Sequence, residues 1–301
     1  MSQTIGIASA SLRCAWADVE GKNDDCWFVE TLGISDNQKR DVGTAASRGD
    51  DIDPVVSHLV AATSGHLYKN VVGRLHDYPV PEIRLADGKG KSLLDVGCSW
   101  GRWSMAAAKK GYMPIGVDPS LGAVLAAKRV AKRLGLPFHG VVADARFLPF
   151  QTDSFDVAFS YSVLQHFSKS DARTAFENIH RVLRTDGTFL VQMASALGIR
   201  SLQHQVRRGF GQPKDFDVRY WTPTELLRTF RDIFGPTELE VDCYFGLGLQ
   251  PTDARLMSGV GKFLIHTSEA LRSVSKTFKP MIYLADSLYL KSAGPDLRSS
   301  D

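Results

Sequence analysis

Several features that would narrow the function quickly are scarce in this sequence of 301 residues. Its four cysteines, at positions 14, 26, 98 and 243, are scattered and form no C-x-x-C pair. That distribution argues against both a zinc ribbon and a disulfide framework. No run approaches the roughly 18 consecutive apolar residues of a membrane-spanning helix, and the first residues lack the apolar stretch of a secretory signal. We therefore expect a cytoplasmic protein.

The sequence also has little excess of either positive or negative charge. With 36 Lys and Arg against 33 Asp and Glu, the net charge is only +3, which is too weak to predict a nucleic-acid partner. The excess is concentrated in residues 194–221, whose charged residues are Arg200, Arg207, Arg208, Lys214, Asp215, Asp217 and Arg219. A solvated loop is the default interpretation of such a segment. The alternative is a basic cap over an active site that favours an anionic acceptor or a phosphate-bearing carrier.

What the chain does contain is a regular alternation of short apolar runs and helical patterns. The apolar runs predict strands at Ser92–Val96, Pro114–Val117, His139–Ala143, Phe155–Ser160 and Thr188–Gln192. The helical patterns between them cover Trp103–Lys110, Leu121–Leu134 and Asp171–Leu183. This alternation predicts an α/β fold in which right-handed crossovers build a parallel sheet with helices on both faces. Further along, Thr222–Glu225 is a capping box that starts another helix, and Leu239–Tyr244 and Ser287–Lys291 predict two final strands.

The chain divides into segments around this regular middle. Residues 1–53 are poor in periodicity and predict an extension or linker, and residues 54–90 predict an N-terminal helical lid. The core follows at 91–193 and the basic cap insertion at 194–221. Residues 222–301 complete the fold and include a helical insertion at about 250–282.

The most informative stretch lies where the first predicted strand ends. Asp95 stands within that strand, and Gly97 and Gly101 follow it four positions apart. A dinucleotide fingerprint has the different spacing G-x-G-x-x-G. Asp118 ends the next strand 21 positions after Gly97, where a carboxylate can accept two hydrogen bonds from a ribose diol.

Together these residues resemble the class I S-adenosylmethionine-dependent methyltransferases, in the type 11-like small-molecule branch that includes quinone methyltransferases. The resemblance spans roughly residues 91–192. It implies a Rossmann-like, seven-stranded, mostly parallel sheet whose last strand is antiparallel, and S-adenosylmethionine as the cofactor. The chain departs from the family pattern at Ser99 in the first motif, and at Thr185 and Asp186 in a turn before the fifth strand.

The resemblance also assigns cofactor contacts to residues at the ends of successive strands. Asp95 would accept a hydrogen bond from the cofactor ammonium and Asp144 one from the adenine amine, while the Ala145 N–H would meet a ring nitrogen. An Asp at a strand end also serves as a turn former or a helix cap. The full set predicted to bind the cofactor is Asp95, Gly97, Cys98, Ser99, Trp100, Gly101, Asp118, Pro119, Ser120, Asp144, Ala145 and Ser160.

Methyl transfer needs a catalytic base only when the acceptor must lose a proton. His166, just after the fourth strand, is the candidate base. A structural histidine that caps the next helix or bonds a backbone carbonyl is an equal alternative. Tyr161 is the second catalytic candidate, as a donor or as an aromatic face beside the sulfonium, with a core residue as its alternative. No clustered acidic residues predict a metal site.

The leading hypothesis is a methyltransferase for a small-molecule acceptor, by O-methylation of a sugar or another specialised metabolite. A basic amphipathic pattern between Arg255 and Lys279 favours a helix packed on the domain, or else methylation of a quinone or lipid at a membrane surface. A catalytically inactive protein that binds S-adenosylmethionine is a third hypothesis. The glycine spacing disfavours a nicotinamide dehydrogenase. The sequence fixes neither the acceptor nor the oligomeric state.

Overall fold

The computed structural model describes residues 75–213, 217–246, 248 and 250–292, together with the short pieces 52–53, 56–57 and 59–60. Apart from its last two residues, the predicted extension over residues 1–53 lies outside the described part of the chain, as does most of the predicted lid up to residue 74. The described residues of that lid at 56–57 and 59–60 are helical. Val56 and Val60 among them are fully buried, so this segment contributes to the core.

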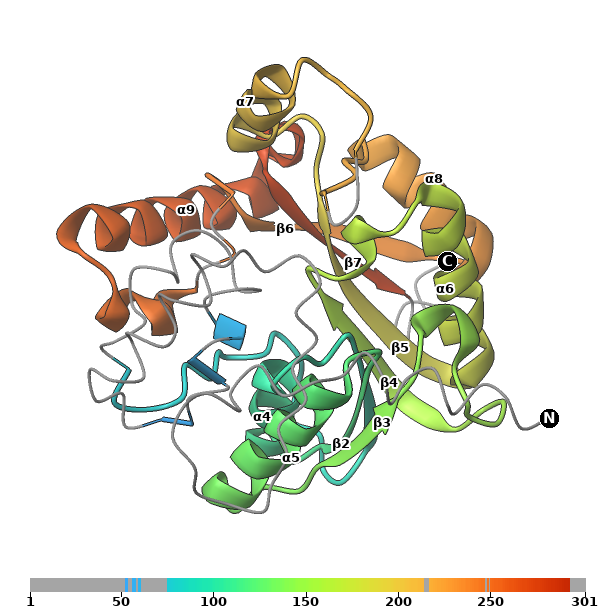
Figure 1. The fold of residues 1–301 in the computed structure, drawn as a ribbon. Coiled ribbons are helices and arrows are strands. Elements are labelled where there is room, and N and C mark those ends of the chain that lie inside the picture. The colour runs from blue at the N-terminus through green and yellow to red at the C-terminus, as the bar shows by residue number, and fades with distance from the viewer. Residues whose placement is uncertain are drawn as a thin grey trace.

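A sheet of seven strands, in the order β3-β2-β1-β4-β5-β7-β6, organises the described residues (Figure 1). The strands are β1 Ser92–Val96, β2 Met113–Asp118, β3 His139–Val142, β4 Phe155–Tyr161, β5 Leu183–Ala194, β6 Thr237–Cys243 and β7 Ser287–Ser292. The first five strands pair in parallel, and β7 runs antiparallel to both of its neighbours. The predicted Rossmann-like sheet, mostly parallel with an antiparallel last strand, is therefore confirmed.

Helices cover both faces of this sheet, as the alternating pattern predicts (Figure 1). Among the helices that flank it are α4 Arg102–Lys109, α5 Leu121–Leu134, α6 Lys169–Val182 and α8 Pro223–Phe234. Between α6, α8 and the sheet, the rings of Phe176, Phe189 and Phe230 lie 5.4–6.2 Å apart. Apolar side chains from both layers thus bury each other, which is how a layered α/β domain forms its core.

Local signals set the helix boundaries. The Ser120 side chain caps α5 by accepting a hydrogen bond from the Ala123 N–H, and Gly135 ends the helix in a left-handed conformation with φ 65°. At the predicted capping box, Thr222 Oγ1 accepts the N–H of Glu225 at 3.2 Å and α8 begins.

The strand β5 begins earlier than the sequence predicts. It starts at Leu183, directly after α6, rather than at Thr188. The pairing with β4 explains the difference: Phe155 pairs with Leu183, whereas Val157 pairs with Thr188, so residues 184–187 bulge between them. The turn residues that the sequence places here are accommodated inside the strand.

The chain enters and leaves the predicted basic cap at neighbouring positions beside the end of β5. The chain leaves β5, forms α7 (Ile199–Arg207) above the sheet in Figure 1, and returns at Trp221. A parallel bridge joins Ser195 to Trp221, and the Ala196 N–H donates to the Trp221 carbonyl at 2.7 Å. The cap therefore contains a helix and is closed at its base.

The predicted helical insertion near the C-terminus forms α9, which packs along β6. Its bounds are Gly259–Thr277, and the 3-10 helices η4 (Pro251–Leu256) and η5 (Lys279–Leu284) flank it. By contrast, the described part of the predicted lid at 75–90 is irregular rather than helical, although it buries Leu75 and Ile83. In the part of the chain that the structure describes, no helix has the length and apolar character needed to cross a membrane.

Candidate cofactor and acceptor site

The turn after β1 depends on two glycines. Gly97 and Gly101 have φ angles of +77° and +83°, a region that strains any residue with a Cβ. A Cβ at Gly101 would lie 2.9 Å from the Cβ of Ala127, so a larger residue would push α4 away from α5. A Cβ at Gly97 would collide with the side chain of Val163, which covers this glycine. The turn can therefore form only with a bare backbone at both positions.

Asp118, at the end of β2, organises the same turn. Its Oδ2 accepts the N–H of Ser99 and its Oδ1 accepts the N–H of Ser120, both at 2.9 Å. The carboxylate is half-buried at the carboxyl edge of the sheet, where open α/β folds bind ligands, and Pro119 beside it is exposed. A carboxylate oxygen accepts more than one hydrogen bond, so this arrangement is compatible with the predicted ribose contact.

Ser99, the departure from the family pattern, suits a polar ligand. It is held in the left-handed region with φ 47°. Its hydroxyl is buried and, among the described residues, has no hydrogen-bond partner. Leaving such a group unsatisfied costs about 1–3 kcal/mol, which the amino acid end of a bound cofactor would relieve. The residues present therefore fit S-adenosylmethionine at this turn.

Asp95 lies beneath the turn rather than on its surface. It is 1% exposed, and its Oδ2 accepts a hydrogen bond from the Ser104 hydroxyl at 2.6 Å. Burial raises the pKa of this carboxyl to about 7. A nearby cationic ammonium favours the ionised form, so the chemistry of Asp95 is compatible with its predicted role. The contact itself stays a prediction.

Asp144 forms a turn and an ion pair together. Its carboxylate accepts the N–H of Arg146 at 2.8 Å and lies 2.7 Å from the Arg146 guanidinium. The pKa of Asp144 is held below its usual range, chiefly by the side-chain hydrogen bond from Arg146. The turn-forming alternative is thus present, and the adenine contacts of Asp144 and Ala145 stay predictions. Sequence reasoning missed Arg146, whose signal was its position two residues after Asp144.

Three residues predicted to bind the cofactor have side chains that serve the core. The Ser160 hydroxyl is fully buried and donates to the Val96 carbonyl at 3.0 Å. Cys98 is buried against Gly116, and Trp100, at 1% exposure, packs near Tyr78. Their contacts with the cofactor stay predictions.

Tyr161 belongs to a buried aromatic cluster. Its ring centroid lies 4.5 Å from that of Trp103 and 6.0 Å from that of Tyr289, and its hydroxyl donates to Asp242 Oδ2 at 2.8 Å. Burial and the neighbouring Asp242 raise the pKa of Tyr161 well above its ordinary value. The hydroxyl proton is thus held by Asp242, which agrees with the core alternative, while the catalytic role of Tyr161 stays a prediction.

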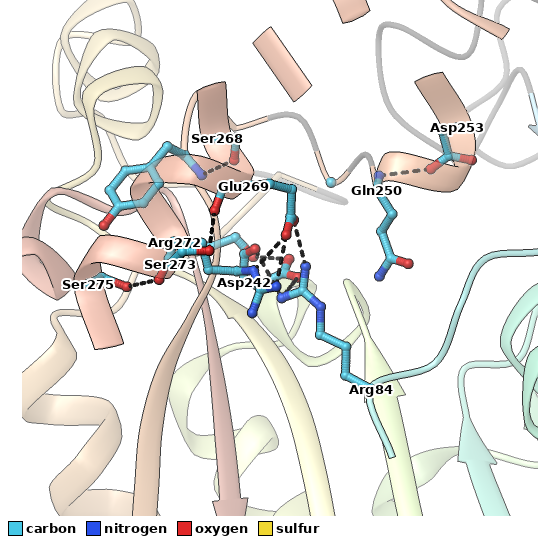
Figure 2. A network of polar contacts seen from close by, with 12 residues as sticks. Arg84, Asp242, Gln250, Asp253, Ser268, Glu269, Arg272, Ser273 and Ser275 are labelled. Carbon is cyan, nitrogen blue, oxygen red and sulfur yellow. Dashed lines mark hydrogen bonds and ion pairs between the residues drawn. The ribbon is translucent and has the colours of Figure 1, made fainter. Parts of the chain in front are cut away.

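Around Asp242 lies a polar network that sequence reasoning missed (Figure 2). Asp242 is 1% exposed and also accepts from the Ser287 hydroxyl at 2.8 Å. Arg84 pairs with Asp242 at 3.3 Å and with Glu269 of α9 at 3.0 Å, and Glu269 in turn pairs with Arg272. The network fastens the irregular segment 75–90 and helix α9 to the edge of the sheet.

A second ion pair joins the glycine turn after β1 to the C-terminal insertion. Arg102, the residue after Gly101, pairs with the Asp253 carboxylate at 3.1 Å, and both side chains are at least nine-tenths buried. Asp253 also accepts the N–H of Gln250 at 2.9 Å, seen on the right of Figure 2. The glycine turn is therefore braced from the side of η4.

His166 lies in the turn between β4 and α6, and it is half-buried. Ser168 caps α6, because its hydroxyl accepts the N–H of Asp171 at 3.0 Å. The helix cap is therefore Ser168 and not His166. The His166 carbonyl accepts a hydrogen bond from the Arg219 guanidinium. His166 as a base stays a prediction.

Comparisons with known proteins agree with this geometry. Residues 93–187 match a family model described as a methyltransferase domain. An uncharacterized protein, MJ1252, of Methanocaldococcus jannaschii is 30% identical over 151 residues, covering 50% of this chain and 55% of that protein. A ubiquinone biosynthesis O-methyltransferase of Coxiella burnetii is 31% identical over 99 residues, covering 33% of this chain and 42% of that protein. The chain thus spans about half the length of these curated relatives.

A solved structure shares the fold across most of the chain. It is described as the [4+2]-cyclase SpnF, with 19% sequence identity and a TM-score of 0.50, covering 88% of this chain and 96% of that one. Residues 93–187 are therefore similar to a methyltransferase domain, and the seven-stranded sheet that contains them has the Rossmann-like fold predicted for a class I S-adenosylmethionine-dependent methyltransferase. The cofactor of this class is S-adenosylmethionine.

Proposed function

We propose that this protein transfers a methyl group from S-adenosylmethionine to the oxygen of a small-molecule acceptor, a sugar or another specialised metabolite, in the cytoplasm. The observation that carries the proposal is the Asp118 carboxylate, which holds the N–H groups of Ser99 and Ser120 at 2.9 Å each. Through these two hydrogen bonds the carboxylate fixes the glycine turn. A carboxylate at this position is also suited to accept hydrogen bonds from a ribose diol. The name of the Coxiella burnetii relative, an O-methyltransferase, supports oxygen as the methylated atom.

Bound S-adenosylmethionine supplies a methyl group already activated by a sulfonium. The chain then has to hold the acceptor in line with that methyl group and exclude water, and such alignment accounts for about 7–11 kcal/mol of barrier lowering in well-oriented systems. The ring of Tyr161, at the end of β4, packs 4.5 Å from the buried ring of Trp103, and such apolar packing would help to exclude water. His166 removes the proton of the acceptor hydroxyl.

Calorimetric titration with S-adenosylmethionine, S-adenosylhomocysteine and NADH tests the cofactor half. We expect both adenosyl thioether compounds to bind, NADH not to bind, and Asp118→Ala to lose binding. Asp186→Ala removes an exposed carboxylate outside the site and should bind as the unchanged protein does. Binding of NADH alone would overturn the proposal.

A His166→Ala variant tests the catalytic half once an acceptor is known. Loss of a general base should lower kcat by about 100-fold or more, while the Kd for S-adenosylmethionine stays the same. His266→Ala, which removes an exposed histidine on α9, is the matched control. An unchanged kcat in His166→Ala would remove His166 from the mechanism.

The fold itself leaves a second candidate function. The structural neighbour is described as a cyclase, so this architecture is compatible with chemistry other than methyl transfer. A protein that binds S-adenosylmethionine without transferring its methyl group would show normal titration and no methylated product.

Methylation of a quinone or lipid at a membrane surface is a third candidate. On α9, Val260 and Phe263 are 72% and 67% exposed, and Lys262 lies between them. An exposed apolar pair beside a basic residue is typical of an interfacial helix. Activity that requires anionic liposomes would favour this candidate over an acceptor free in solution.

A further inference from the structure

A cleft separate from the glycine turn lies between the end of α7, the start of α6 and the returning chain of the basic cap. Its volume is about 450 Å³, within the range of small-molecule sites. Three cationic side chains line it: Lys169 from α6, Arg208 after α7, and Arg219. Among the described residues that line the cleft, none is acidic.

Two of these cations form ion pairs with acids that are not among the described lining residues. Lys169 pairs with Glu225 at 2.6 Å and Arg208 with Asp217 at 3.6 Å, and both acids approach from outside the lining. The Nε of Arg208 is buried and, within the described chain, has no hydrogen-bond partner. A guanidinium presents its N–H groups as a planar fork that matches carboxylate and phosphate oxygens. The cleft is therefore suited to an oxyanion.

The cleft adjoins the turn that carries the candidate base. The Arg219 guanidinium donates to the His166 carbonyl, and the Arg219 N–H donates to the Gln165 carbonyl at 2.8 Å. Ser168, two positions after His166, is itself a lining residue. The cleft therefore borders the turn on which His166 lies.

We propose that this cleft binds the acidic group of the methyl acceptor, so that the acceptor is a small hydroxylated carboxylic acid or phosphate monoester. The inference rests on the proposed function, because it assigns the cleft to the acceptor of that reaction. On this proposal the basic cap forms part of a binding site and is not simply a solvated loop. The cofactor turn stays a separate site.

Titration of the full chain with three ring compounds tests the proposal: phenyl phosphate, benzoate and the neutral benzyl alcohol. At least one anion should bind about tenfold or more tightly than the alcohol, and added salt should weaken it. The tighter of the two anions distinguishes a phosphate from a carboxylate. Arg208→Gln and Lys169→Gln should each weaken anion binding, whereas Arg173→Gln, an exposed change elsewhere on α6, should not.

S-adenosylhomocysteine is titrated into each variant in parallel. Its Kd should be the same in all of them, because the cleft lies apart from the glycine turn. Equal binding of the three ring compounds, or anion binding undiminished in both cleft variants, overturns the inference while the proposed function stands. Failure of S-adenosylhomocysteine to bind any form overturns the proposed function, and with it the assignment of the cleft to a methyl acceptor.

Discussion

At the scale of single residues, Asp95 shows the sharpest conflict between a side chain and its surroundings. Its carboxyl is 1% exposed and has the Ser104 hydroxyl as its hydrogen-bond donor. Desolvation disfavours the ionised form, which is why the pKa rises from 3.8 to about 7. The folded protein therefore binds a proton at Asp95 more tightly than the unfolded chain does.

This difference predicts a pH dependence of stability. The contribution of Asp95 is fully present below pH 4 and is lost as the pH rises toward about 7, by up to about 4 kcal/mol. Asp95→Asn cannot ionise, so its free energy of unfolding should be flatter over this range. Urea denaturation at several pH values measures it, with the exposed Asp186→Asn as control. Identical slopes in wild type and Asp95→Asn would contradict the prediction.

Tyr161 leads to a second residue-scale prediction. Tyr161→Phe removes a hydrogen-bond donor from the buried Asp242 carboxylate and should lower the free energy of unfolding by about 1–3 kcal/mol. The exposed Tyr283→Phe should change it little. Thermal denaturation of both variants measures the difference. If Tyr161→Phe instead leaves stability intact and abolishes turnover, the hydroxyl acts in catalysis.

At the scale of elements, the approach of α4 to α5 depends on Gly101. Gly101→Ala adds strain at φ +83° and a contact 2.9 Å from Ala127, so we expect a loss of about 2–4 kcal/mol. Gly135→Ala, at φ +65° with open space around it, carries only the strain and should lose about 1–2 kcal/mol. Chemical denaturation compares them. Equal losses would show that the helices tolerate the added methyl group.

The sequence predicts these elements well because their signals are local. The strand Ser92–Val96 and the helix Leu121–Leu134 coincide with β1 and α5, since apolar periodicity and caps are properties of neighbouring residues. The start of β5 differs because a bulge against β4 depends on pairing between strands. Likewise, the order of the aspartates predicts which edge of the sheet binds the cofactor, but it does not reveal that Arg146 pairs with the carboxylate of Asp144.

At the scale of the whole molecule, long-range ion pairs were beyond the reach of the sequence. Arg84 bonds to residues 158 and 185 positions away, and Arg102 bonds across 151 positions. Each partner is an ordinary charged residue in its own segment, so periodicity carries no sign of the pairing. The basic cap was recognisable from charge alone, whereas the cleft beneath it required the fold.

The Arg84 pairs predict a coupled response of distant segments. Arg84→Ala leaves Asp242 buried with one cation fewer and should cost about 3 kcal/mol, although Tyr161 and Ser287 still donate to it. Amide hydrogen exchange should accelerate in both α9 and residues 75–90. Arg173→Ala, which breaks an exposed pair with Glu177, should cost less than about 1 kcal/mol. Faster exchange confined to residues near Arg84 would contradict the coupling.

The place of β7 in the sheet has a consequence for how the protein is made. This strand is the last of the seven in chain order, yet it lies between β5 and β6. On the ribosome, β5 must wait with an open edge, and β6 has no strand to pair with, until residues 287–292 emerge. Synthesis can therefore assemble β1 to β5 as it proceeds, but the side of the sheet beyond β5 closes only in a later step. A chaperone that shields the edge of β5 would act during that interval.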